Sequence, residues 1–279
     1  MPTQFPQAHQ TPSVQFNLRQ LSKNCGIRNG ALPAPQVHVH PHLVSASVAL
    51  AADLRARVQA NPELVLGLPT GSTPKALYAE MVRLHDADGM NWSRTRSFNL
   101  DEYWPMASNH PQSFARFMRE HLFEPADLDP SRTHIPSGDV SPESVALHCA
   151  AYEAAIASCG GIEIQILGIG LNGHLGFNEP GAERDTRTDL VELAASTRER
   201  AAAAFSPEAV PERGITMGLA TILEAKEIVM LAFGAEKAEP VAAAIEGPVC
   251  AECPASFLQE HANVRWFLDE AAASGLSKR

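Results

Sequence analysis

The stretch IEIQILGIGLNGHLGFNEPG, residues 162–181, joins a short apolar run to a loop of glycines and polar residues. The run 162–167 is typical of a buried strand in a parallel sheet. So many glycines disfavour a helix, and the His, Asn and Glu side chains disfavour a buried strand. The segment therefore predicts a strand that ends in a permissive, polar loop.

Other apolar runs along the chain also end in polar residues, and helical segments lie between them, although the sequence shows no internal repeat. Apolar runs at 64–68, 96–100 and 228–233 each end in polar residues, and residues 47–58, 74–84, 141–159 and 240–246 have helical spacing. Strand–helix alternation predicts a doubly wound, mostly parallel sheet with helices on both faces, a Rossmann-like α/β fold in a single domain. We expect this domain to span 37–279 and to follow a poorly structured N-terminal extension, 1–36.

Ligands of such sheets bind beyond the carboxyl ends of the strands. Four predicted loops lie at such ends: 69–73, 101–104, 170–181 and 234–237. Because these ends meet at one edge of a parallel sheet, four polar loops there indicate a functional site more strongly than any single motif.

Composition limits the classes of partner. The 279 residues are 45% hydrophobic and 19% charged, and the formal charge is −10. The absence of a long basic stretch argues against a nucleic-acid partner. No apolar run approaches the ~18 residues of a membrane span, and the N-terminus lacks an apolar signal core. We therefore expect a cytoplasmic protein with a small-molecule partner; composition leaves the oligomeric state open.

Cysteine and histidine patterns give little support for a metal or redox centre. The five cysteines are Cys25, Cys149, Cys159, Cys250 and Cys253. An odd count does not indicate a disulfide framework, and Cys250-Ala-Glu-Cys253 lacks the second ligand pair that zinc needs. His38, His40 and His42 alternate as on one face of a short strand, which favours a surface strand end over a metal site.

The loop after the run 64–68 has the composition of an anion site. Thr70, Gly71, Ser72 and Thr73 lie between a strand and a helix, where free N–H groups and the helix dipole attract a phosphate. The alternative is an ordinary turn in which Thr73 caps the helix. The stretch matches neither the P-loop nor the dinucleotide pattern. Lys237 can reach a phosphate from its own loop, or be a solvated lysine at a helix end.

Asp101 and Glu102 form a pair of neighbouring carboxylates at a strand end. Neighbours in an extended segment point opposite ways, so at most one faces a cleft and the other holds structure. A carboxylate in a partly dry pocket has a raised pKa and suits proton abstraction beside a carbonyl or imine. Surface acidity is the alternative.

The loop 170–181 contains a histidine with polar neighbours. His174 can move a proton between sugar oxygens near neutral pH, and a carboxylate such as Glu179 can fix its tautomer, with Asn172 nearby. No serine or cysteine is placed beside it as a nucleophile. A loop histidine satisfied by backbone groups is the alternative.

Four motifs, LGLPTGSTPKALY, FNLDEYWP…HPQSF, GIGLNGHLGFNEPG and GAEKAEPVAAAIEG, have the order and spacing of the glucosamine-6-phosphate deaminase/isomerase family. The chain resembles that family over about 37–272. The resemblance implies no metal or organic cofactor and the conversion of glucosamine 6-phosphate and water to fructose 6-phosphate and ammonia. It implies that Asp101 is the base, that His174 with Glu179 and Asn172 opens the ring, and that loop 70–73 and Lys237 hold the phosphate.

Two departures from the family pattern stand out. After Thr197-Arg198 the family usually has an arginine where this chain has Ala203, and Arg200, one helical turn earlier, is the candidate substitute. Without it, the substrate can differ from the family norm. Activated bacterial members carry basic residues where this chain has Asp189 and Val191, so we expect no allosteric site of that kind.

Two other functions remain as alternatives. A 6-phosphogluconolactonase-like hydrolase shares the fold, but that family typically reads DER where this chain reads DEY, and it lacks FNEP. A sugar-phosphate sensor without catalysis is the other; the chain shows no helix-turn-helix segment and no basic surface.

Overall fold

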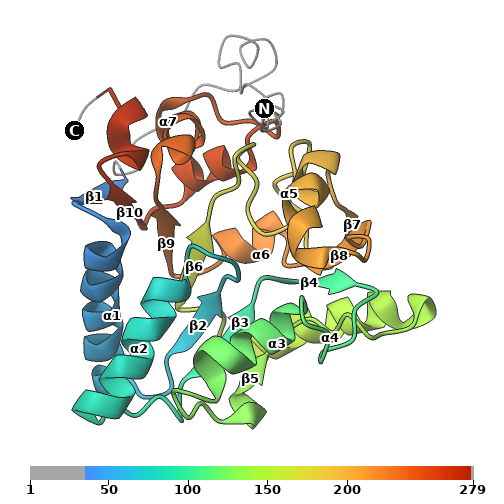
Figure 1. Ribbon diagram of the computed structural model, residues 1–279, viewed down its shortest axis with the longest axis horizontal. Helices are drawn as coiled ribbons and strands as arrows, with labels where there is room; N and C mark the ends of the chain where they lie inside the picture. Colours follow the sequence, from blue (N-terminus) through green and yellow to red (C-terminus); the bar gives the residue numbers. More distant parts are fainter. Residues whose placement is uncertain (1–34, 278–279) are drawn as a thin grey trace, which may run out of the picture.

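The computed structural model describes residues 35–277, with a parallel seven-stranded sheet at the centre (Figure 1). The expected extension, 1–36, lies almost wholly outside the described residues. The strands run in the order β1 (Gln36–His40), β10 (Val264–Asp269), β9 (Glu227–Ala232), β6 (Ile164–Gly168), β2 (Val65–Leu68), β3 (Arg96–Asn99) and β5 (Thr133–His134). All six pairings are parallel.

Helices cover both faces of this sheet, which confirms the predicted fold class. On one face lie α1 (Leu43–Ala60) and α2 (Lys75–Asp88), side by side in Figure 1; α4 (Val145–Ser158), α6 (Leu219–Leu223) and α7 (Ala238–Glu246) lie on the other. The strands alternate between the two cores: Ile164 and Ile166 of β6 pack with α1 and α2, and Leu167 packs on the opposite side. Burial of both faces explains why these strands read as continuous apolar runs.

The sequence DEYW, predicted as a loop, is a strand of a second sheet. Here β4 (Asp101–Trp104), β8 (Arg213–Thr216) and β7 (Asp189–Glu192) pair antiparallel in the order β4-β8-β7. The prediction missed this strand because its partner lies more than 100 residues further along the chain. The small sheet packs beside the carboxyl edge of the large one, since β4 follows β3 after the single residue Leu100.

The remaining elements are short, apart from one helix. They are α3 (Phe114–Met118), η2 (Arg119–Phe123), η3 (Pro130–Arg132), η4 (Pro142–Ser144), α5 (Ala195–Phe205), η5 (Ala235–Lys237), η6 (Pro254–Glu260) and η7 (Ala272–Gly275). The predicted helix 141–159 is divided into η4 and α4, and Val145, Cys149, Tyr152 and Ile156 are buried on its apolar face, as the spacing predicts. Cys159, the last expected position, follows α4 as its C-cap and is half-buried. His42 caps α1, with Nδ1 accepting from the amide of Ser45 at 3.1 Å, while His38 and His40 lie on the edge strand β1.

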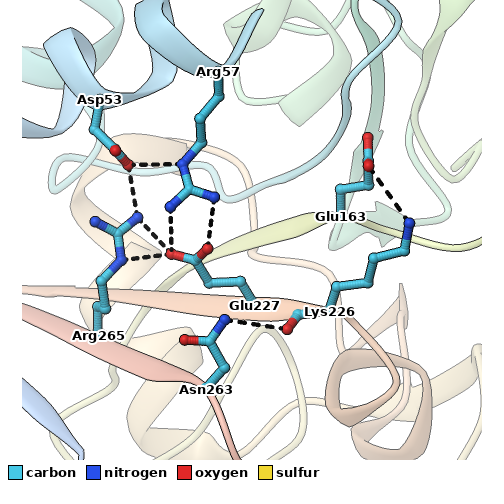
Figure 2. A network of polar contacts seen from close by, with 7 residues as sticks. All are labelled: Asp53, Arg57, Glu163, Lys226, Glu227, Asn263 and Arg265. Carbon is cyan, nitrogen blue, oxygen red and sulfur yellow. Dashed lines mark hydrogen bonds and ion pairs between the residues drawn. The ribbon is translucent and has the colours of Figure 1, made fainter. Parts of the chain in front are cut away.

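An ion-pair network joins α1 to the amino ends of two strands, opposite the predicted site (Figure 2). Glu227, at the start of β9, contacts Arg57 at 2.8 Å and Arg265 of β10 at 2.5 Å. Asp53 of α1 binds both arginines, at 3.2 and 2.7 Å. Lys226, which is exposed, pairs with the half-buried Glu163 at the same edge, at 3.4 Å. The network fixes this edge of the sheet, and the carboxyl edge carries the cavity described below.

Within residues 35–277, no three His, Cys, Asp or Glu side chains are grouped as ligands for a metal ion. Over the same range no helix combines the length and the apolar character that a membrane span needs.

Candidate active site

A cavity of about 320 Å³ opens at the carboxyl edge of the large sheet, where the strand order reverses between β6 and β2. This is where doubly wound folds bind ligands. Seven of the ten residues proposed from the sequence line it: Thr70, Gly71, Ser72, Thr73, Asp101, His174 and Lys237, together with the candidate Arg200. The two remaining residues, Asn172 and Glu179, lie behind His174 and contact its loop rather than the cavity.

The loop 69–73 leads from β2 into the 14-residue helix α2. Gly71 has a φ of +104°, which an L side chain rarely adopts, so a glycine is needed for the turn. Pro74 occupies the N-cap position, which leaves the Thr73 side chain to line the cavity rather than cap the helix. The hydroxyl of Tyr78 donates to the carbonyl of Pro69 at 2.5 Å and anchors the loop. The loop thus lines the cavity directly at the N-terminal end of α2, where the helix dipole favours an anion.

Asp101 is the acid of the cavity. Its side chain is only 6% exposed, and burial, with a smaller contribution from the charge of Glu102, raises its pKa from 3.8 to about 8. The loop 170–181 passes close by: a Cβ on Gly176, whose φ is +57°, would lie 3.2 Å from Asp101 Oδ2. A carboxyl group whose pKa is near neutrality can both accept and return a proton.

Glu102 has a different environment, as expected for its neighbour in a strand. It is 1% exposed. Its two oxygens accept from the amides of Tyr103, Phe114 and Ala115 and from the hydroxyl of Ser113, at 2.7–3.0 Å. Burial raises the pKa of Glu102, and these four hydrogen bonds oppose the rise. Glu102 therefore holds the start of α3 and does not line the cavity.

His174 is backed by a carboxylate. Its Nδ1 lies 3.3 Å from Glu179 Oε2, close enough for an ion pair although the ring N–H is not well aligned as a donor. Asn172 Nδ2 donates to the same oxygen at 2.8 Å. Burial tends to raise the pKa of Glu179, but the nearby imidazole of His174 and the hydrogen bonds from Thr197 and Asn172 lower it to about 2. Gly170 permits this arrangement, because a Cβ there would lie 2.4 Å from the imidazole ring.

Two cationic side chains border the cavity. Lys237 Nζ donates to the carbonyl of Ile169 at 2.7 Å, and its other two protons remain for a ligand. Burial and the charge of Arg200, opposed by Glu236, lower the pKa of Lys237 to about 8. Arg200 is exposed on α5 and reaches the cavity, whereas Ala203 does not line it.

Thr197 is a site residue that the sequence interpretation did not include. It lines the cavity, and its hydroxyl donates to Glu179 Oε1 at 2.5 Å. In the sequence, Thr197 was noted only as a member of the pair Thr197-Arg198, which lies in α5, and no role was predicted for it. Its contact with Glu179 spans 18 positions and has no local signal.

Cys250 and Cys253 lie behind the loop 170–181 and line no part of the cavity. Both are buried, and the amide of Cys253 donates to the carbonyl of Cys250 at 3.2 Å in a turn. The surrounding segment holds the loop: the amide of Ala255 donates to Gly173 at 2.9 Å, and the amide of Gly181 donates to Ala251 at 2.8 Å. These hydrogen bonds indicate that the segment 250–255 supports the loop 170–181.

The fold and the cavity define a doubly wound α/β protein with an acid, an imidazole and cationic groups around one hollow. Residues 42–266 match the family described as glucosamine-6-phosphate isomerases/6-phosphogluconolactonase, and the chain belongs to this family. The resemblance recognised in the sequence motifs is thereby confirmed.

Named relatives lie within the deaminase branch. A glucosamine-6-phosphate deaminase of Rhodopirellula baltica is 47% identical over 251 residues, 90% of this chain and 99% of the relative. Glucosamine-6-phosphate deaminase 2 of Bacillus subtilis is 45% identical over 229 residues, which cover 81% and 91% of the two chains.

Two solved structures of related proteins superpose on this chain. A monomeric glucosamine-6-phosphate deaminase superposes with a TM-score of 0.82 at 37% identity, over 86% of this chain and 99% of its own. A 6-phosphogluconolactonase from Trypanosoma brucei reaches a TM-score of 0.69 at 23% identity, over 88% and 100%, and shares the fold.

Proposed function

We propose that this protein converts glucosamine 6-phosphate and water to fructose 6-phosphate and ammonia, in amino-sugar metabolism. The observation that supports this proposal is that Asp101, on β4 of the small sheet, and His174, in the loop after β6 of the large sheet, line one cavity together with the loop 70–73 and Lys237. The two relatives described above, which are 45–47% identical to this chain, are named as deaminases of the same substrate. The proposal also includes a single catalytic domain over residues 37–279 and a cytoplasmic location.

The phosphate binds at the loop 70–73. Backbone amides at the start of α2 and the ammonium of Lys237 supply donors and positive charge for it. Arg200 adds a guanidinium from α5, in the role that the family gives to the arginine replaced by Ala203. This places the phosphate at one end of the cavity and the sugar ring toward Asp101 and His174.

Ring opening is the task of His174. The imidazole takes the proton of the anomeric hydroxyl and delivers a proton to the ring oxygen, which breaks the ring C–O bond and leaves the open-chain aldehyde. Glu179 keeps the proton of the resting ring on Nδ1, so that Nε2 is the acceptor, and Asn172 holds Glu179 in turn.

Asp101 then moves a proton between two carbons. As a carboxylate it takes the proton from the amine-bearing carbon while the aldehyde oxygen gains a proton, which forms an enolamine. It then returns its proton to the neighbouring carbon while the nitrogen gives up one proton, so the net change is an isomerisation. The product is a ketose imine. Water adds to its C=N carbon and ammonia leaves, so the atoms balance with no redox change and no cofactor.

An ammonia-release assay on purified protein tests the proposal. Glucosamine 6-phosphate should be turned over, and unphosphorylated glucosamine should react far more slowly. Lactone hydrolysis in place of ammonia release would make the protein a 6-phosphogluconolactonase-like hydrolase, and binding without turnover of either would make it a sensor.

The phosphate role of Arg200 has its own test. Arg200→Ala should raise KM for glucosamine 6-phosphate by about tenfold, because a charge-assisted hydrogen bond is lost. Arg198→Ala is the matched control, since Arg198 pairs with Glu212 at 3.5 Å and does not line the cavity. Equal KM values for the two variants would remove Arg200 from the site.

A further inference from the structure

The carboxylate of Glu179 is held from two separate elements. Oε2 faces Asn172 and His174, which belong to the same loop as Glu179, whereas Oε1 accepts a hydrogen bond only from Thr197 of α5 among the described residues. The Thr197 contact, at 2.5 Å, therefore restrains the carboxylate from outside the loop and, together with the Asn172 hydrogen bond to Oε2, opposes rotation about its terminal bond.

That rotation matters for His174 because its Nδ1 depends on a single acceptor. Nδ1 is buried, and the part of the chain that the structure describes offers it no aligned hydrogen-bond partner; Glu179 Oε2, at 3.3 Å, is its charged neighbour. A small turn of the carboxylate moves Oε2 away from the ring. The proton could then move to Nε2, and the nitrogen that faces the cavity would no longer be a base.

The same turn of α5 also carries Arg200, one of the two cationic side chains of the cavity. Thr197 and Arg200 are three residues apart on α5, so they lie on one face of the helix, and both line the cavity. An anion bound by Arg200 therefore restrains the helix turn that holds Glu179. Phosphate binding by Arg200 and the orientation of the His174 imidazole therefore depend on the same turn of α5.

We propose that Thr197 is a positioning residue that fixes the Glu179 carboxylate, keeps the His174 proton on Nδ1, and links this arrangement to anion binding by Arg200. The inference rests on the proposed function for its kinetic consequences. Its structural part concerns the tautomer of His174 and stands independently of the substrate.

Kinetics with three variants test the positioning role. Thr197→Val keeps the shape of the side chain without the hydroxyl, and we expect kcat to fall on the order of tenfold, the rate equivalent of one net hydrogen bond, with KM within twofold. Thr197→Ser keeps the hydroxyl and should recover most of kcat. Ser196→Ala removes a hydroxyl from the neighbouring position of α5 and should leave both constants unchanged.

The ¹⁵N shifts of the His174 imidazole supply a readout that a purely structural role would not move. The wild type and Thr197→Ser should show the proton on Nδ1, and Thr197→Val a mixture of tautomers. Inorganic phosphate should shift the wild type further toward the Nδ1–H form and leave Thr197→Val unchanged. A phosphate response that survives in Thr197→Val overturns the link to Arg200.

The outcomes separate the two proposals. Unchanged kcat and unchanged imidazole shifts in folded Thr197→Val overturn the positioning role, whatever the wild type does with substrate. No ammonia release by the wild type overturns the proposed function and leaves the ¹⁵N experiment decisive for Thr197. Should Thr197→Val not fold, Thr197→Ala is judged by the same criteria.

Discussion

Replacing Asp101 by Asn should inactivate the protein and, at alkaline pH, stabilise it. The substitution preserves shape but removes the ionisable group. As the proposed carbon base, Asp101 should contribute about 10²–10⁴-fold to kcat, and Asp101→Asn should lose that factor. Retention of ammonia release within twofold of the wild type would refute the role of base.

The effect on stability follows from the pKa of Asp101, which burial raises from 3.8 to about 8. Between these two pH values the folded protein keeps a proton that the unfolded chain releases, so stability falls as the pH rises through this window. Each tenfold change in the acidity constant corresponds to about 1.4 kcal/mol, which gives a penalty on the order of 5 kcal/mol at pH 8 and little at pH 4. Asparagine has no such penalty.

Urea unfolding of wild type and Asp101→Asn at pH 5 and pH 8 measures the difference directly. The variant should gain several kcal/mol relative to the wild type between the two pH values, and the paired comparison cancels the titration of groups that do not interact with Asp101. A stability difference that is the same at both pH values would refute the view that burial holds this carboxyl protonated. The same pKa predicts that kcat/KM of the wild type rises with pH toward about 8, as Asp101 ionises.

The remaining predictions concern packing and charge. Gly170→Ala should lower kcat on the order of 100-fold, because its Cβ would lie 2.4 Å from the His174 ring and displace it, while Gly168→Ala, whose Cβ meets nothing within 4 Å, should cost less in a parallel assay. Glu227→Gln should destabilise the fold by about 3 kcal/mol in urea without changing kcat, since Glu227, 7% exposed, is the shared partner of two arginines. Lys226→Ala, which removes a 65% exposed partner, should change stability by less than about 1 kcal/mol, and equal losses in the two variants would contradict this ranking.

The fold could be predicted because its determinants are local. The central strands are buried on both faces, so their apolar character is visible in the sequence, and the polar loops that follow them mark the carboxyl edge. The antiparallel sheet was missed because nothing near DEYW indicates its pairing with β8: the register Asp101–Thr216 is set by tertiary structure. The contact between Thr197 and Glu179 escaped for the same reason.

The neighbouring acids Asp101 and Glu102 show how the missed strand matters for the chemistry. Alternation along β4 sends Glu102 to three hydrogen-bond donors at the start of α3, and the amide of Tyr103 supplies a fourth, so its charge is solvated by the protein. It sends Asp101 to the cavity, where burial raises its pKa and the charge of Glu102 raises it further. Had 101–104 been the loop predicted from the sequence, both carboxylates could turn to water and neither would be held near neutral pKa. The second sheet is therefore what turns an ordinary acidic pair into one anchor and one candidate base, and a one-residue shift in its register would exchange the two roles.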